Sequence, residues 1–169
     1  AKMRRTSICG ATETILCHKD IANKLLPPLL EKLLNAGCEV RGDSEVVELN
    51  KKVKKANELD WKKEYLDSVV SIKVVNSLNE AIKHINNYSS KHTDAIITNS
   101  TKNAKLFLTE IESAIVMHNT STQFSDGAEF GLGAEIGIST GKLHARGPVS
   151  TQELTTYKYI VKGNGQLRQ

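Results

Sequence analysis

The chain has 169 residues, of which 39% are hydrophobic and 25% charged, and its formal net charge is +4 at neutral pH. This length suits one domain that buries a real core, and the composition is typical of a globular protein rather than a disordered one. No apolar run approaches the ~18 residues that a membrane-spanning helix needs, so we expect no membrane partner.

Short apolar strands alternate with amphipathic helices along most of the chain. We expect strands at 14–18, 38–41, 69–75, 94–98 and 113–118. We expect helices at 20–37, 44–55, 77–88 and 100–111. This order predicts an α/β fold with a mostly parallel sheet flanked by helices. A last strand at 155–161 alternates but has no helix after it, which predicts an edge that pairs with another chain.

Local signals predict how the helices begin and end. Asp20 and Ser44 are suitable N-caps, and Gly37 is a suitable residue just past a helix C-terminus. Pro27 and Pro28 fall inside the first helical pattern, so we expect them to kink or restart it.

The densest basic run has no interleaved aromatic residues and is flanked by acidic ones. Its members are Lys51, Lys52, Lys54 and Lys55. This pattern favours the solvated face of a helix over a nucleic-acid surface, although a basic stripe of this kind leaves nucleic-acid binding as a remote alternative.

The chain has three cysteines, Cys9, Cys17 and Cys38, with no CxxC pair and no spacing typical of a zinc site. An odd count in a chain without a signal peptide predicts reduced thiols in the cytoplasm. Cys17 and Cys38 fit buried apolar positions. Cys9 lies in a segment of small residues near Arg4 and Arg5, whose charges would lower its pKa. The residues alone leave Cys9 open between a reactive thiol and a small buried hydrophobe.

The segment 126–148 holds five glycines before its closing Gly147-Pro148 pair. With Asp126, Glu129 and Phe130 at its start, it predicts a bent, rigid wall of a ligand pocket, with a structural loop as the alternative. The glycine spacing matches neither a P-loop nor the dinucleotide fingerprint, so the chain shows no nucleotide-binding motif of its own.

Long strings of this sequence resemble the gamma-glutamyl phosphate reductase family of the aldehyde dehydrogenase superfamily. They include AKMRRTSICGATETILCH at 1–18 and NTSTQFSDGAEFGLGAEIGISTGKLHARGP at 119–148, and further strings lie at 60–86, 89–98 and 153–168. The resemblance implies a catalytic domain at 1–150, followed by an oligomerisation strand and tail at 151–169. It also implies that the N-terminal NADP-binding domain of the family is absent from this chain.

The family's chemistry implies roles for individual residues. Cys9 would attack L-glutamyl 5-phosphate to form a thioester, which NADPH reduces to L-glutamate 5-semialdehyde for proline biosynthesis. Glu64 would meet the nicotinamide ribose. Ser121, Thr122 and Phe130 would line the substrate pocket.

Without a cofactor domain, the chain is not expected to act alone as an oxidoreductase. The resemblance implies a homo-oligomer or a separately made cofactor-domain chain as partner. The alternative is a truncated, inactive member of the family that serves only as a folded binding or oligomerising module.

Overall fold

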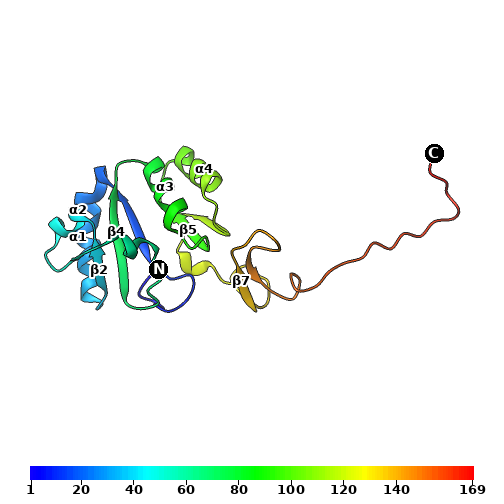
Figure 1. Ribbon diagram of the computed structural model, residues 1–169, viewed down its shortest axis with the longest axis horizontal. Coiled ribbons are helices and arrows are strands. Elements are labelled where there is room, and N and C mark those ends of the chain that lie inside the picture. Colours follow the sequence, from blue (N-terminus) through cyan, green and yellow to red (C-terminus); the bar gives the residue numbers. More distant parts are fainter.

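The computed structural model describes all 169 residues and arranges most of the strands in two parallel sheets (Figure 1). The first sheet has the order β1-β4-β2-β3, with β1 at Thr14–His18, β2 at Glu39–Gly42, β3 at Lys54–Lys55 and β4 at Val69–Val75. The second sheet pairs β5 (Thr93–Ile96) with β6 (Ile115–His118). An antiparallel pair, β7 (Gly137–Ser139) and β8 (Gly147–Val149), follows. The expected α/β fold with mostly parallel strands is confirmed.

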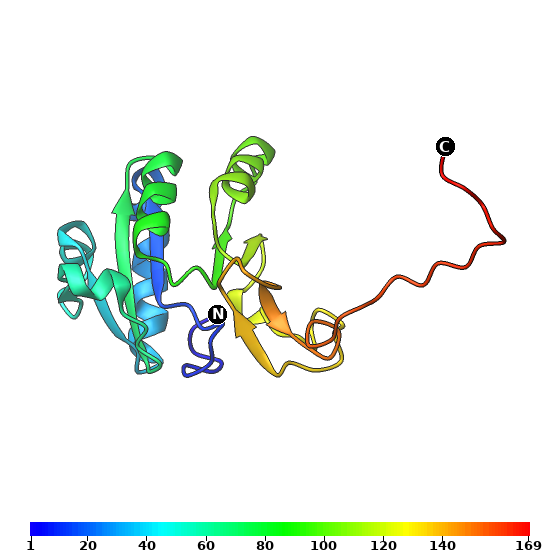
Figure 2. The same cartoon turned by 45° about the vertical axis from the view of Figure 1, so that its right-hand side comes forward.

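Helices separate the strands of both sheets. They are α1 (Lys19–Asn35), α2 (Ser44–Leu49), α3 (Leu78–Tyr88) and α4 (Thr101–Glu110), with two short 3₁₀ helices, η1 (Glu58–Lys62) and η2 (Thr122–Phe124). The main core packs α1 and α2 against the first sheet through aliphatic residues such as Leu26, Leu30 and Ile72. A smaller core joins α3 to α4 through Ile82 and Phe107, so α3 lies between the first sheet and α4 (Figure 2).

Helix α1 begins and continues differently from the expectation. His18, rather than Asp20, is the N-cap, because its Nδ1 accepts a hydrogen bond from the backbone N–H of Asp20 at 3.2 Å. Pro27 and Pro28 lie inside one continuous helix and do not restart it. Both prolines are exposed, while Leu26 and Leu30 on either side are fully buried. Core packing therefore outweighs the lost backbone hydrogen bonds.

Helix α1 ends at a glycine, as expected. Gly37 has a φ of +79°, and its N–H donates to the carbonyl of Leu34 at 3.0 Å. The next N–H, of Cys38, donates to the carbonyl of Leu33 at 2.9 Å. These two bonds form a Schellman motif, which satisfies carbonyls that the helix end leaves free.

The expectation of a helix over 44–55 was wrong beyond its first turns. Asp43 caps α2 through a bond from Val46 N to its carboxylate at 3.0 Å, and the helix ends at Leu49. The chain then returns to the sheet, where Lys54 and Lys55 pair with β2 in parallel. The lysines are solvated, but on an edge strand, where positive charge discourages pairing with further strands.

The two parallel sheets do not join. Strand β1 pairs only with β4, and β5 pairs only with β6, so each of these two strands keeps one unpaired edge. Figure 2 shows β1 and β5 on facing sides of the gap between the two layers. The other expected strands occur with small shifts at their ends.

The expected strand at 155–161 is not formed within this chain. Residues from Thr155 to Gln169 run away from the body as an extended segment without a paired strand (Figure 1). Tyr157, Tyr159 and Val161 are 78%, 84% and 91% exposed. A strand needs a neighbour, and this segment runs beside none of the sheet edges of the chain (Figure 1). None of the helices has the length and apolar character to cross a bilayer.

Candidate active site

Cys9 lies on the irregular loop that leads into β1, and its side chain is exposed. The N–H of Ala11 donates to the carbonyl of Ile8 at 3.0 Å, which closes a tight turn around Cys9. Cys17 and Cys38 are instead buried in the main core, as expected. Only Cys9 among the three thiols is therefore open to a reagent or substrate.

The 3₁₀ helix η2 packs directly against this loop. A Cβ added to Gly10 would lie 2.8 Å from the carbonyl oxygen of Thr122, so only glycine permits this approach. The hydroxyl oxygens of Thr12 and Thr122 are 3.1 Å apart and share a hydrogen bond. Residues separated by more than a hundred positions in the sequence thus meet beside Cys9.

The pKa of Cys9 is raised, contrary to the expectation from the neighbouring arginines. Burial makes the largest contribution, and the carboxylate of Glu135 adds to it. The backbone N–H groups of Gly10 and Cys9 act in the opposite direction by favouring the thiolate. Neither neighbouring arginine is among the main influences on the thiol, and Nε of Arg4 donates instead to Oε1 of Gln123 at 2.8 Å. Arg4 and Arg5 are close to Cys9 in the sequence, but this did not lower the pKa of the thiol.

A cavity of about 930 Å³ lies between the facing edges of β1 and β5. Its lining includes Cys9, Glu64, Ser121 and Thr122, so four of the five residues implied by the family resemblance share it. Phe130 is outside this lining and 44% exposed. The walls come from β1, α1, α3, β5 and the turn before η2, and not from the glycine-rich segment.

The glycine-rich segment instead folds on itself next to the Cys9 loop. Gly127 donates its N–H to the carboxylate of Glu135 at 2.9 Å. Gly131 and Gly133 have φ values of +74° and +75°, which ordinary residues rarely adopt. The segment therefore uses its glycines for turns, and it approaches Cys9 closely enough for the charge of Glu135 to raise the thiol pKa.

A buried polar network supports the connection that carries Glu64. Asp60 is only 2% exposed and accepts hydrogen bonds from Arg41 Nη1 at 2.6 Å and from the Tyr65 hydroxyl at 2.9 Å. Burial alone would raise the pKa of Asp60, but the N–H of Asn57 and these two side chains outweigh it and the pKa is lowered. Asp60 and Tyr65 flank Glu64, whose carboxylate makes no hydrogen bond within the chain and stays exposed beside the cavity.

Two histidines with buried, unpartnered Nε2 atoms also line the cavity. His92 holds its Nδ1 2.7 Å from Thr93 Oγ1, while His84 packs edge-on to Trp61 with ring centroids 5.5 Å apart. Burial lowers the pKa of both rings, which favours their neutral forms. The histidines are spread along the chain without a shared motif, so the sequence gives no signal for either of them.

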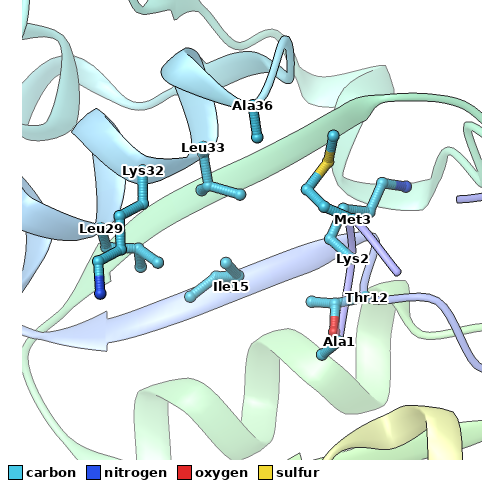
Figure 3. Close-up of a pocket in the computed structure, with 9 residues that line it drawn as sticks. All are labelled: Ala1, Lys2, Met3, Thr12, Ile15, Leu29, Lys32, Leu33 and Ala36. Atoms are coloured by element: carbon cyan, nitrogen blue, oxygen red, sulfur yellow. The ribbon is translucent and has the colours of Figure 1, made fainter. Parts of the chain in front are cut away.

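A smaller cavity of about 330 Å³ adjoins the first and shares Ala1, Thr12, Ile15 and Leu29 with its lining (Figure 3). It is bounded by the first three residues, β1 and the last turns of α1, and most of its lining is apolar. Lys2 is buried there, with its Nζ 2.8 Å from the carboxylate of Glu13. None of the family-implied residues lines it. No group of three or more His, Cys, Asp or Glu side chains converges as a metal site would require.

The sequence is similar to curated gamma-glutamyl phosphate reductases. It is 59% identical to the protein of Rhodospirillum rubrum and 56% identical to that of Bradyrhizobium diazoefficiens, in both cases over 99% of this chain. The chain spans 39% of the length of these relatives.

Solved structures give the same similarity. The gamma-glutamyl phosphate reductase of Thermotoga maritima matches 99% of this chain and 41% of its own, with 48% identity and a TM-score of 0.95. An acetylating aldehyde dehydrogenase of Geobacillus thermoglucosidasius shares the fold at 14% identity, with a TM-score of 0.69 over 96% of this chain and 45% of its own.

A sequence model described as the aldehyde dehydrogenase family matches residues 49–158. That range covers more than half of the chain, from α2 to the extended C-terminal segment, and includes Glu64 and the whole glycine-rich segment. The fold, the cavity beside Cys9 and this match agree, and the chain belongs to the aldehyde dehydrogenase family.

Proposed function

We propose that this chain is the catalytic part of an NADPH-dependent gamma-glutamyl phosphate reductase, with Cys9 as its nucleophile. One observation carries the proposal: the only exposed thiol borders a large cavity, in a chain 55–59% identical to reductases of that name. The product would be L-glutamate 5-semialdehyde, and the proposed role is in proline biosynthesis, with the cytoplasm as the proposed location.

In this proposal Cys9 attacks the acyl carbon of L-glutamyl 5-phosphate. The new C–S bond forms, the C–O bond to phosphate breaks, and inorganic phosphate leaves with its electron pair. Because the pKa of Cys9 is raised, the thiolate is a minor form at neutral pH. The N–H groups of Cys9 and Gly10 limit that penalty. Such N–H groups also suit the oxyanion that develops on the acyl oxygen.

The cofactor supplies a hydride to the thioester carbon when it is bound. Glu64 fits a role in holding it, since its exposed, unpaired carboxylate can accept hydrogen bonds from ribose hydroxyls. The network around Asp60 would keep Glu64 at the cavity rim. Because the chain spans only 39% of the length of its relatives and none of its loops has the spacing of a phosphate-binding motif, the proposal assigns the remaining cofactor contacts to residues outside this chain.

Substrate contacts are proposed for Ser121, Thr122 and Phe130. Ser121 Oγ accepts the N–H of Gln123 at 3.2 Å, which leaves its O–H to donate to a substrate oxygen. Thr122 shares a hydrogen bond with Thr12 and shapes the cavity wall beside Cys9. Phe130, outside the cavity lining, would cover the substrate from the neighbouring turn.

The nucleophile can be tested without the cofactor. Acetyl phosphate is a stable acyl phosphate that should acylate Cys9, giving a hydroxylamine-sensitive adduct visible by intact-mass spectrometry. Cys9→Ser should abolish the adduct, while Cys17→Ser should retain it. An adduct of equal yield in Cys9→Ser would exclude Cys9 as the nucleophile.

The inactive-module alternative rests on the 39% coverage of the relatives. It differs in one measurable respect: an inactive module would show no acyl transfer to any thiol. In either case calorimetry should detect no binding of NADPH to the chain alone, and tight binding would show that this chain holds a complete cofactor site.

A further inference from the structure

Gln123, at the centre of η2, reaches across to the loop that precedes Cys9. Its side chain is buried, with the residue 7% exposed. Nε2 donates to the backbone carbonyls of Ala1 and Arg5, the latter at 3.2 Å, and Oε1 accepts from Nε of Arg4 at 2.8 Å. Both N–H donors and the oxygen of this carboxamide are therefore engaged by one segment of the chain.

The neighbouring residue of η2 holds the loop on the far side of Cys9. Thr122 shares a hydrogen bond with Thr12, and its carbonyl oxygen lies against Gly10. Two consecutive residues thus contact the loop on both sides of the thiol, Gln123 before it and Thr122 after it. We call this pair, Thr122 and Gln123, the η2 clamp.

The segment that carries Cys9 has no regular structure of its own, since residues 1–13 contain no helix or strand. Its ends are anchored: Lys2 Nζ lies 2.8 Å from the carboxylate of Glu13, and the carbonyl of Glu13 accepts the N–H of Ser71 at 2.9 Å. Between these ends, apart from the clamp, the turn from Ile8 to Ala11 and a long bond from Thr12 N to the carbonyl of Ala1 at 3.4 Å are the backbone hydrogen bonds of the loop. The backbone N–H groups of Cys9 and Gly10 favour the thiolate, and their direction depends on the path that the clamp imposes on the loop.

We propose that Gln123 is a positioning residue for Cys9: its carboxamide fixes the path of the loop that carries the thiol, and with it the direction of the backbone N–H groups of Cys9 and Gly10. Gln123 does not itself line the cavity, although it hydrogen-bonds to Ala1, which does. It acts through the loop. The catalytic significance of this inference rests on the proposed role of Cys9 as nucleophile. The effect of Gln123 on the pKa of the Cys9 thiol does not depend on that role.

The test compares Arg4→Met with the double variant Arg4→Met/Gln123→Met. The Arg4 change removes a cation that the loss of Gln123 would otherwise release beside the thiol. Cys9 alkylation by iodoacetamide is followed by peptide mass spectrometry over about pH 6.5–9.5, a range that brackets an ordinary thiol. Gln152→Met, at an exposed glutamine whose side chain makes no hydrogen bond, is the matched control.

Loss of the carboxamide should move the alkylation profile to higher pH and lower the rate at pH 7 by roughly three- to tenfold, since each unit of thiol pKa changes the thiolate fraction about tenfold. Amides 8–12 should exchange hydrogen faster in the same variant. Gln123→Glu, which keeps an acceptor for Arg4 but has no N–H donor, should give the same direction of change.

An unchanged alkylation profile in a folded Gln123 variant, even with faster amide exchange, would overturn the positioning role. The outcome is separable from the proposed function. A shifted profile without acyl transfer from acetyl phosphate leaves Gln123 as a positioning residue and removes the nucleophile. Acyl transfer to Cys9 that is as fast in Arg4→Met/Gln123→Met as in Arg4→Met removes only the positioning role.

Discussion

Gly10 shows how closely the site depends on a single missing atom. Its Cβ would lie 2.8 Å from the Thr122 carbonyl oxygen and 3.3 Å from the Gln123 Cα, both of them backbone atoms that cannot rotate away. The close contact is also what brings Thr12 and Thr122 within hydrogen-bonding distance.

Gly10→Ala should therefore force η2 away from the loop and lower the free energy of unfolding by roughly 1–3 kcal/mol, as overpacking of a tight site does. Urea titration followed by circular dichroism measures this loss. Gly141→Ala is the matched control, because its Cβ would meet nothing closer than Ser139 Oγ at 4.0 Å. Equal midpoints for the two variants would contradict the tight contact.

Among single residues, the sequence distinguished Cys9 as the candidate for a reactive thiol but did not show what sets its pKa. Cys9 was distinguished by small neighbours, and Cys17 and Cys38 by apolar ones, and both indications agree with the observed exposure. Glu135 raises the pKa of Cys9, and Gln123 accepts a hydrogen bond from Arg4. In both cases the two partners are more than a hundred residues apart along the chain. No local pattern encodes such contacts.

At the scale of elements, α3 carries an unusual buried group on the face that meets η1. His84 is 8% exposed, its Nε2 has no partner, and its ring lies 4.6 Å from that of Tyr88. Burial, with Lys73 adding to it, lowers the pKa of His84, while Glu58 and Glu80 oppose the shift. The folded chain thus favours the neutral ring.

A buried neutral histidine makes stability depend on pH in a known direction. The unfolded chain binds a proton below about pH 6.5, while the folded chain does so only at lower pH, so the free energy of unfolding falls as pH decreases through that interval. The limiting slope is about 1.4 kcal/mol per pH unit for one proton.

His84→Phe should remove this component, keeping the contact with Trp61 and flattening the decline below about pH 6.5. Chemical denaturation at a series of pH values provides the comparison, with His144→Phe at an exposed position as control. If His84→Phe declined as steeply as the parent chain, the histidine would not be the source of the dependence.

Periodicity predicted the strands and helices with few errors because most of them bury one face in a core. The wrong predictions, of a helix over 44–55 and of a break at the two prolines, share a cause. Helix α2 stops at Leu49 and the lysines that follow join a sheet edge, which only the position of β2 determines. Pro27 and Pro28 remain inside α1 because the packing of Leu26 and Leu30 outweighs local preference. Tertiary contacts decide both cases.

At the scale of the whole molecule, the last fifteen residues contribute no core. Tyr157, Tyr159 and Ile160 are more than 70% exposed, and the segment has no paired strand. Alternating aromatic and β-branched residues in an extended segment favour pairing with a second copy of the chain or another sheet edge.

Deleting 155–169 should therefore leave the free energy of unfolding unchanged within about 0.5 kcal/mol, because nothing buried is removed. The same deletion should abolish concentration-dependent association, measured by size exclusion with light scattering. Glu153, whose carboxylate accepts hydrogen bonds from Ser150, is retained in the shortened chain. A full chain that stays monomeric at high concentration would argue against pairing through this segment.

The meeting of residues 1–12 with residues 122–123 also fixes when the site can arise during synthesis. Cys9 leaves the ribosome more than a hundred residues before Gln123, and closing so long a loop is among the slower steps of folding. A nascent chain consequently carries this thiol on a loop that lacks its η2 contacts until the second parallel sheet has been translated.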